Sequence, residues 1–131
     1  MNASRVIVSL PTGDLRSAYQ FYREIGFRAA AGEGDGMPEP VEFVLNDGVN
    51  LMVIPKGGFG WVAGGNAVAP PGNSECILSL SASSETEVEV LVSRVRSAGG
   101  EIAAGPTQEP WGYSATFKDL DGHVWMVVHS P

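Results

Sequence analysis

Few imidazole or thiol side chains are available in this sequence for catalysis or metal binding. His123 and His129 are the only histidines, and Cys76 is the only cysteine. His123 follows an Asp-Gly turn, where a structural role is the simpler interpretation, and His129 lies close to the C-terminus. A single cysteine excludes an internal disulfide and any metal site built from a cysteine cluster. These three residues therefore do not predict a catalytic centre by themselves.

Two serines occupy equivalent places in a repeated sequence. Residues 7–10 read Ile-Val-Ser-Leu, and residues 77–80 read Ile-Leu-Ser-Leu. Side chains two residues apart lie on the same face of a strand, so each isoleucine is expected to share a face with the serine that follows it. The hydroxyls are suited to bonding a ligand, and equally to bonding backbone or water. The four residues concerned are Ile7, Ser9, Ile77 and Ser79.

Aromatic side chains supply a second set of candidate ligand contacts. Phe59 and Trp61 lie in a long Gly-rich central segment, and Trp111 and Tyr113 are expected to share a strand face. Aromatic residues on loops often contact flat ligands or partner proteins. The alternative interpretation is a small hydrophobic cluster that holds the loops in place. Trp125 is expected in the core instead.

The composition describes a globular chain with an acidic surface. Its 131 residues are 44% apolar and 18% charged, and the net charge is −7. This charge argues against nucleic-acid binding, which needs patches of Lys and Arg. It suits a cationic ligand, or serves solubility alone. No apolar run is long enough to span a membrane and no signal peptide is recognised, so we expect a cytoplasmic protein.

Each half of the sequence predicts a strand, a helix and three further strands. Asp14 is a suitable N-cap and Gly26 a suitable terminator for the first helix. A capping box, Ser84-Glu-Thr-Glu87, begins the second helix, and Gly99-Gly100 ends it. The expected strands are residues 5–10, 27–31, 41–45 and 49–54 in the first half, and residues 76–81, 102–104, 112–118 and 124–129 in the second.

The predicted fold is α+β, with tandem βαβββ modules whose two sheets surround a central cleft. We expect a single domain over residues 1–131, with module one at about 1–56 and module two at 74–131. Residues 57–73 connect the modules; they are too Gly-rich for regular structure and are a candidate lid. The sequence leaves open whether the cavity forms within one chain or across a dimer.

Two segments resemble the vicinal oxygen chelate superfamily, which includes glyoxalase I, the bleomycin-resistance proteins and the extradiol dioxygenases. Residues 10–27 read LPTGDLRSAYQFYREIGF, and residues 117–125 read FKDLDGHVW. Residues 88–100, which end in Ala-Gly-Gly, are similar to the second helix of that family. The resemblance implies the tandem fold and a homodimer, but it does not select one activity.

The same resemblance identifies the positions at which metal ligands would lie. Metalloenzymes of the superfamily place His, Gln or Glu at up to four symmetric cavity positions. The resemblance maps these positions onto Ile7, Met52, Ile77 and Met126. Leu51 replaces Met52, and Cys76 replaces Ile77, if the alignment shifts by one residue. Alkyl and thioether groups do not bind the divalent metals that imidazole and carboxylate bind, so we expect no metal and no cofactor.

Together these interpretations favour metal-independent binding or sequestration of a small hydrophobic or cationic molecule, in the manner of the bleomycin-resistance proteins. The alternative is an enzyme of lyase or dioxygenase type with an atypical or misregistered metal site. A third hypothesis is a structural or regulatory dimer whose cavity is filled by apolar side chains. We predict no catalytic residue. The expected ligand contacts are Ile7, Ser9, Met52, Phe59, Trp61, Ile77, Ser79, Trp111, Tyr113 and Met126.

Overall fold

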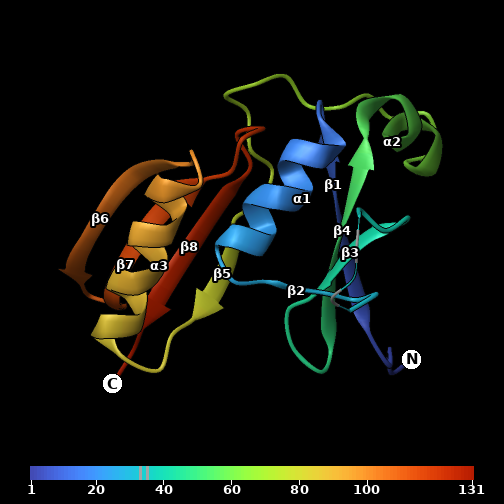
Figure 1. Ribbon diagram of the computed structural model, residues 1–131. Coiled ribbons are helices and arrows are strands. Elements are labelled where there is room, and N and C mark those ends of the chain that lie inside the picture. The colour runs from blue at the N-terminus through green and yellow to red at the C-terminus, as the bar shows by residue number, and fades with distance from the viewer. Residues whose placement is uncertain (33, 35) are drawn as a thin grey trace. The chain divides into compact units, whose positions relative to one another are not determined.

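Two compact units make up the chain, Met1–Ala69 and Pro70–Pro131. The computed structural model describes residues 1–32, 34 and 36–131 (Figure 1). Each unit contains one four-stranded sheet and a helix of ten or more residues. The predicted α+β class with a repeated order of strand, helix and three strands is confirmed. No helix among the described residues is long and apolar enough to cross a membrane.

The first unit has the strand order β1-β4-β3-β2. Strands β1 and β4 are parallel, and the other neighbouring pairs are antiparallel. Helix α1 begins where predicted, because the Asp14 carboxylate accepts a hydrogen bond from the Ser17 backbone N–H at 3.1 Å. The elements are β1 (Val6–Thr12), α1 (Leu15–Glu24), β2 (Arg28–Ala29), β3 (Val41–Val44), β4 (Val49–Pro55) and α2 (Lys56–Val62).

Helix α1 covers one face of the first sheet with aromatic side chains. Tyr22 of α1 lies 5.7 Å from Phe43 of β3, measured between ring centroids, and Phe43 pairs with Leu51 of β4. Tyr22 is 1% exposed, and Phe43 and Leu51 are fully buried. Because strand residues alternate between faces, the neighbours of Phe43 and Leu51 along each strand point away from α1.

Helix α2 contradicts the prediction that residues 57–73 have no regular structure. Residues Lys56–Val62 form a helix despite three glycines. Its C-terminal end is closed by hydrogen bonds from Ala63 N–H to the Phe59 carbonyl and from Gly65 N–H to the Gly60 carbonyl. The helix also contacts β1 and β4. Such tertiary contacts override a poor intrinsic helix propensity.

The second unit has the equivalent strand order, β5-β8-β7-β6. Helix α3 contacts β6, β7 and β8, and lies across them in Figure 1. Its N-cap is confirmed, since Ser84 Oγ accepts a hydrogen bond from the Glu87 backbone N–H at 3.1 Å. Trp125 is fully buried and stacks on Phe117 at 6.2 Å, as its predicted core position requires. The elements are β5 (Leu78–Ser81), α3 (Glu85–Ser97), β6 (Glu101–Glu109), β7 (Gly112–Lys118) and β8 (Val124–His129).

Strand β6 is longer than the three residues expected from sequence. It continues through Gly105 and Pro106 to Glu109, with register shifts against β7 on both sides of Ala104. Gly105 makes this path feasible: its φ is +77°, and a Cβ there would lie 2.5 Å from the Ser114 carbonyl oxygen. A Gly-Pro pair normally indicates a break in a strand, but here the irregular register accommodates it.

Candidate functional site

Each sheet has one face turned away from its long helix, and we call this the far face of the sheet. In the first unit it is the face opposite α1. The strand pairing places Ser9 of β1 directly beside Met52 of β4, and Met52 beside Glu42 of β3. Their sequence neighbours Leu51 and Phe43 are fully buried on the α1 side. Ser9, Met52 and Glu42 therefore form one row across the far face.

The second unit repeats this row on the face opposite α3. Ser79 of β5 pairs with Met126 of β8, and Met126 pairs with Thr116 of β7. On the opposite face, Ala115 and Val127 pair with each other and belong to the core cluster beneath α3. A serine and a methionine thus lie side by side in both sheets.

Three of the four positions that the sequence resemblance associates with metal ligands lie on these strands, Ile7, Met52 and Met126, and the fourth, Ile77, lies just before β5. Ile7 lies on β1 opposite Asn50 and is 50% exposed, while Ile77 lies one residue before β5 and is 59% exposed. Met52 lies on the far face, whereas its alternative Leu51 is buried in the core. Isoleucine and methionine offer no imidazole or carboxylate donor, so these residues do not fit a divalent metal site.

A hydrogen-bonded chain of three polar side chains extends along the far face of the first sheet. Asn50 Nδ2 donates to Glu42 Oε2 at 2.5 Å, and Arg5 Nη1 donates to Asn50 Oδ1 at 2.6 Å. Asn50 is only 5% exposed. Arg5 and Asn50 are not among the site residues predicted from the sequence. Asn50 could have been found, because it precedes Met52 by two residues and strand alternation places both on the same face.

Beside Met52 the first unit contains a hollow of ≈ 540 Å³. Its walls are mostly aliphatic and come from the ends of β3 and β4, from α1 and from α2. The described residues that line it include one acid, Glu39, and no base. They are Leu15, Glu39, Pro40, Val41, Met52, Val53, Ile54, Pro55 and Val62.

The aromatic candidates are distributed differently from the expectation. Trp111 lies in the turn before β7, and its indole N–H donates to Ser114 Oγ on the far face at 3.1 Å. Tyr113 lies on the helix side of the sheet, packs against the core cluster and donates to Glu89 of α3 at 2.9 Å. The predicted shared strand face of Trp111 and Tyr113 is therefore wrong, because alternation does not extend into the turn.

The hydrogen bond of Tyr113 on the helix side also affects the ionisation of its phenol. Its hydrogen bond to Glu89 raises the pKa of the phenol above its ordinary value, with smaller contributions from burial and from the charges of Glu89 and Glu85.

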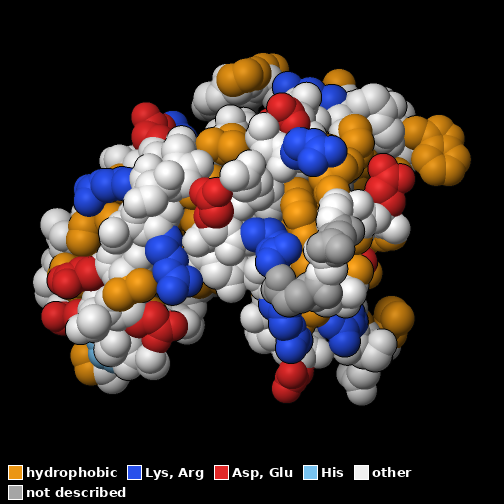
Figure 2. Space-filling view, in the orientation of Figure 1, with side chains coloured by type: hydrophobic (Ala, Val, Ile, Leu, Met, Phe, Trp, Pro, Cys, Tyr) orange, Lys and Arg blue, Asp and Glu red, His pale blue; other side chains and the backbone are white. Residues whose placement is uncertain are grey.

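In the first unit, Phe59 is partly buried in α2, whereas Trp61 is 87% exposed. Hydrophobic side chains emerge among charged ones on the surface shown in Figure 2. The large exposed ones include Val6, Ile7, Trp61, Val62, Ile77 and Trp111.

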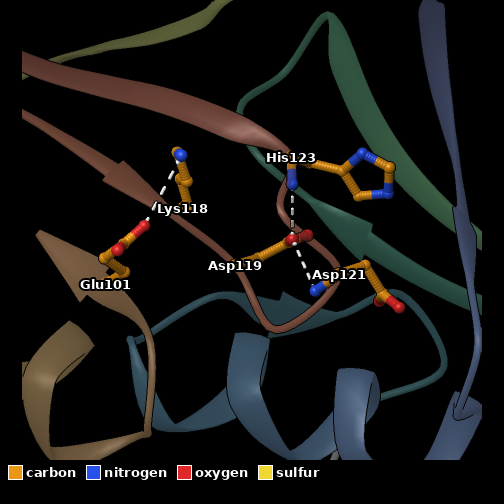
Figure 3. A network of polar contacts seen from close by, with 5 residues as sticks. All are labelled: Glu101, Lys118, Asp119, Asp121 and His123. Atoms are coloured by element: carbon orange, nitrogen blue, oxygen red, sulfur yellow. Dashed lines mark hydrogen bonds and ion pairs between the residues drawn. The ribbon is translucent and has the colours of Figure 1, made fainter. Parts of the chain in front are cut away.

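Asp119, Asp121 and His123 bring possible metal donors within 4.8 Å of one another. Figure 3 shows how the turn between β7 and β8 places them. Asp119 is 7% exposed, and its Oδ1 accepts the backbone N–H groups of Asp121 at 3.0 Å and His123 at 2.8 Å. These bonds close the turn. They involve the Asp119 carboxylate and the backbone of His123, so the structural role expected for the His123 imidazole stays a prediction.

The chain is similar to a known protein family and to solved structures with the same fold. A family model described as Glyoxalase/Bleomycin resistance protein/Dioxygenase superfamily matches residues 5–127. A hypothetical protein from S. aureus is 28% identical with a TM-score of 0.79, covering 94% of this chain and 91% of that one. A glyoxalase-related enzyme from Fulvimarina pelagi is 26% identical with a TM-score of 0.80, covering 96% and 87%.

A third solved structure is described as TnmS3, an antibiotic binding protein from Streptomyces sp. CB03234. It is 23% identical with a TM-score of 0.69, and the match covers 100% of this chain and 99% of that one. At this identity the likeness concerns the fold alone. A search of curated proteins found no match.

Proposed function

Because this chain belongs to the Glyoxalase/Bleomycin resistance protein/Dioxygenase superfamily, we propose that it binds a small hydrophobic or cationic molecule without a metal ion. The observation that carries this proposal is the serine–methionine pair repeated on the far faces of the two sheets, Ser9 with Met52 and Ser79 with Met126. By the family resemblance, Met52 and Met126 correspond to positions at which metalloenzymes of the family carry metal ligands, and Ser9 and Ser79 are their strand neighbours. Here each pair offers hydroxyl and thioether groups.

The chemistry of this pair suits binding. A serine hydroxyl both donates and accepts a hydrogen bond, and a thioether is a flexible, polarisable surface for apolar or aromatic groups. Small-molecule sites are typically apolar with a few polar groups that set the orientation of the ligand. The hollow of ≈ 540 Å³ beside Met52 is within the roughly 300–1,000 Å³ of such sites. We propose ligand contacts at Ile7, Ser9, Met52, Ile77, Ser79 and Met126, with Phe59, Trp61 and Trp111 as accessory contacts.

The fold comparison is compatible with this role. TnmS3 has the same fold and is described as an antibiotic binding protein. Because one fold hosts many functions, this supports a binding role for the architecture and does not name the ligand. The family resemblance also leads us to propose a homodimer, which light scattering of the purified chain would test.

The test is binding of an uncharged apolar dye by protein treated with a chelator. A neutral, environment-sensitive naphthalene dye is titrated into the wild type, Met52→Gln and Val90→Gln. Val90 is 46% exposed on α3 and serves as the matched control. We expect dye binding without metal, about threefold to tenfold weaker binding for Met52→Gln, and no change for Val90→Gln.

A parallel metal titration tests the alternative. Ni²⁺, Zn²⁺, Mn²⁺ and Fe²⁺ are added to the same protein, and bound metal and thermal stability are measured. We expect no stoichiometric binding and no stabilisation. Binding of one metal ion per chain with a raised melting temperature would contradict the proposal and favour a metal-dependent enzyme of the same family.

A further inference from the structure

The far face of the first sheet carries a charge where the repeat has none. Glu42 pairs with Met52, whereas the residue that pairs with Met126 in the second unit is Thr116. The two rows otherwise share the same serine and methionine. The fold of the second unit therefore forms with a neutral hydroxyl at this position, and a carboxylate is not a general requirement of the architecture.

The carboxylate of Glu42 is held in one orientation by a buried neighbour. Asn50 donates to Glu42 Oε2 at 2.5 Å and accepts from Arg5 Nη1 at 2.6 Å. Because Asn50 is 5% exposed and bonded at both ends of its amide, it cannot rotate without losing two hydrogen bonds. A binding group supported in this way by a second residue is preorganised for a ligand.

The hydrogen bond from Asn50 orients Glu42 through a neutral group. An amide is uncharged, and the hydrogen bond of Arg5 is to that amide. Glu42 is half-buried beside Met52, so its carboxylate lies next to apolar surface. Met52 also lines a hollow with aliphatic walls and a second acid, Glu39; Glu42 is the neighbour of Met52 in the sheet and is not among the residues that line the hollow. A cationic group on an apolar ligand would complement both the charge and the walls.

We propose that Glu42 is the residue that recognises charge on the far face of the first sheet. Its Oε1 receives a protonated amine or guanidinium, while the apolar body of the same ligand contacts Met52. This inference rests on the proposed binding function and narrows its ligand to hydrophobic cations. Glu42 lies on β3, outside the four positions at which the family resemblance expects metal ligands.

The test uses two probes with the same naphthylethyl body and different head groups, the protonated amine of 2-(2-naphthyl)ethylamine and the neutral hydroxyl of 2-(2-naphthyl)ethanol. Calorimetry gives the affinity of each for the wild type, Glu42→Gln and Glu24→Gln. Glu42→Gln keeps an oxygen that accepts from Asn50, and thermal unfolding checks that it is folded. Glu24 is the matched control, because it also accepts from a side-chain amide, Gln20 Nε2 at 2.9 Å, but on α1.

We expect the wild type to bind the amine about tenfold more tightly than the alcohol. Glu42→Gln should lose this preference and retain its affinity for the alcohol, and Glu24→Gln should behave as the wild type. Equal binding of the two probes by the wild type would overturn the charge recognition and leave the binding function standing. Loss of preference in both variants would assign it to net charge and overturn the role of Glu42. Binding of neither probe would overturn the proposed function together with this inference.

Discussion

Ser79 lies directly opposite Met126 in the parallel pairing of β5 with β8. The same relationship joins Ser9 to Met52 in the pairing of β1 with β4. The repeat visible in the sequence is therefore preserved at the level of individual strand pairs. A shift of one residue in either pairing would turn the methionine into the core, so burial of the alternate residues keeps the register.

The first prediction concerns these pairs as binding elements. Replacing a serine by alanine removes one hydrogen bond to a ligand, which is about 1 kcal/mol or roughly fivefold in affinity. We expect Ser9→Ala and Ser79→Ala each to weaken binding of a hydroxylated naphthalene probe by about this factor. Ser97→Ala, at the end of α3, is the control and should bind as the wild type. Unchanged affinity in both serine variants would argue that the hydroxyls bond only backbone or water.

The second prediction concerns the buried amide on the far face. Asn50→Leu removes the hydrogen bonds of both Glu42 and Arg5. Glu42 is half-buried, whereas Arg5 is exposed and can bond water instead. Leaving one partly buried polar group without a partner costs about 1–3 kcal/mol, so we expect the free energy of unfolding to fall by about 1–3 kcal/mol. Urea denaturation measures this loss. Thr116→Val, in the equivalent row of the second sheet, should change stability by less, and an equal loss there would contradict the special role of Asn50.

The third prediction concerns Gly112 at the start of β7. Its φ is +136°, and a Cβ there would lie 2.4 Å from the His129 carbonyl oxygen. Gly112→Ala must shift β8 or strain the turn, and we expect a loss of about 2–3 kcal/mol in thermal or urea unfolding.

Gly122 is the matched control for this substitution. It also has a positive φ, +88°, but a Cβ there meets nothing within 4 Å. Gly122→Ala should therefore cost only the backbone strain, about 1–2 kcal/mol. Equal losses in the two variants would show that the contact with His129 is relieved without cost.

The fourth prediction concerns pH. The pKa of Tyr113 is raised in the folded protein, chiefly by its hydrogen bond to Glu89. A phenol with a raised pKa stabilises the fold fully below the ordinary pKa near 10, and this stabilisation is lost as the pH rises through the folded value. The free energy of unfolding of the wild type, measured with urea, should therefore fall above about pH 10 more steeply than that of Tyr113→Phe. Parallel pH profiles would mean that the bond to Glu89 does not couple ionisation to folding.

The sequence determined the architecture because the signals for it are local. The strands expected at residues 112–118 and 124–129 coincide with β7 and β8, and the side chains of Asp14 and Ser84 marked the starts of α1 and α3. Spacing by two residues also predicted a shared strand face for Ile77 and Ser79, whereas the place of Ser79 beside Met126 comes from the pairing of β5 with β8. These inferences need only neighbours in the chain and the period of a strand or helix.

Only the tertiary structure decided the polar part of the site and the shape of the turns. Glu42 and Arg5 are brought to Asn50 by strand pairing and side-chain bonds between residues 8 and 45 positions apart in the sequence. Helix α2 forms with contacts to β1 and β4, although its Gly-rich sequence does not predict a helix. Trp111 and Tyr113 separate because a turn intervenes. In each case the deciding interaction depends on tertiary structure, so local sequence propensity cannot predict it.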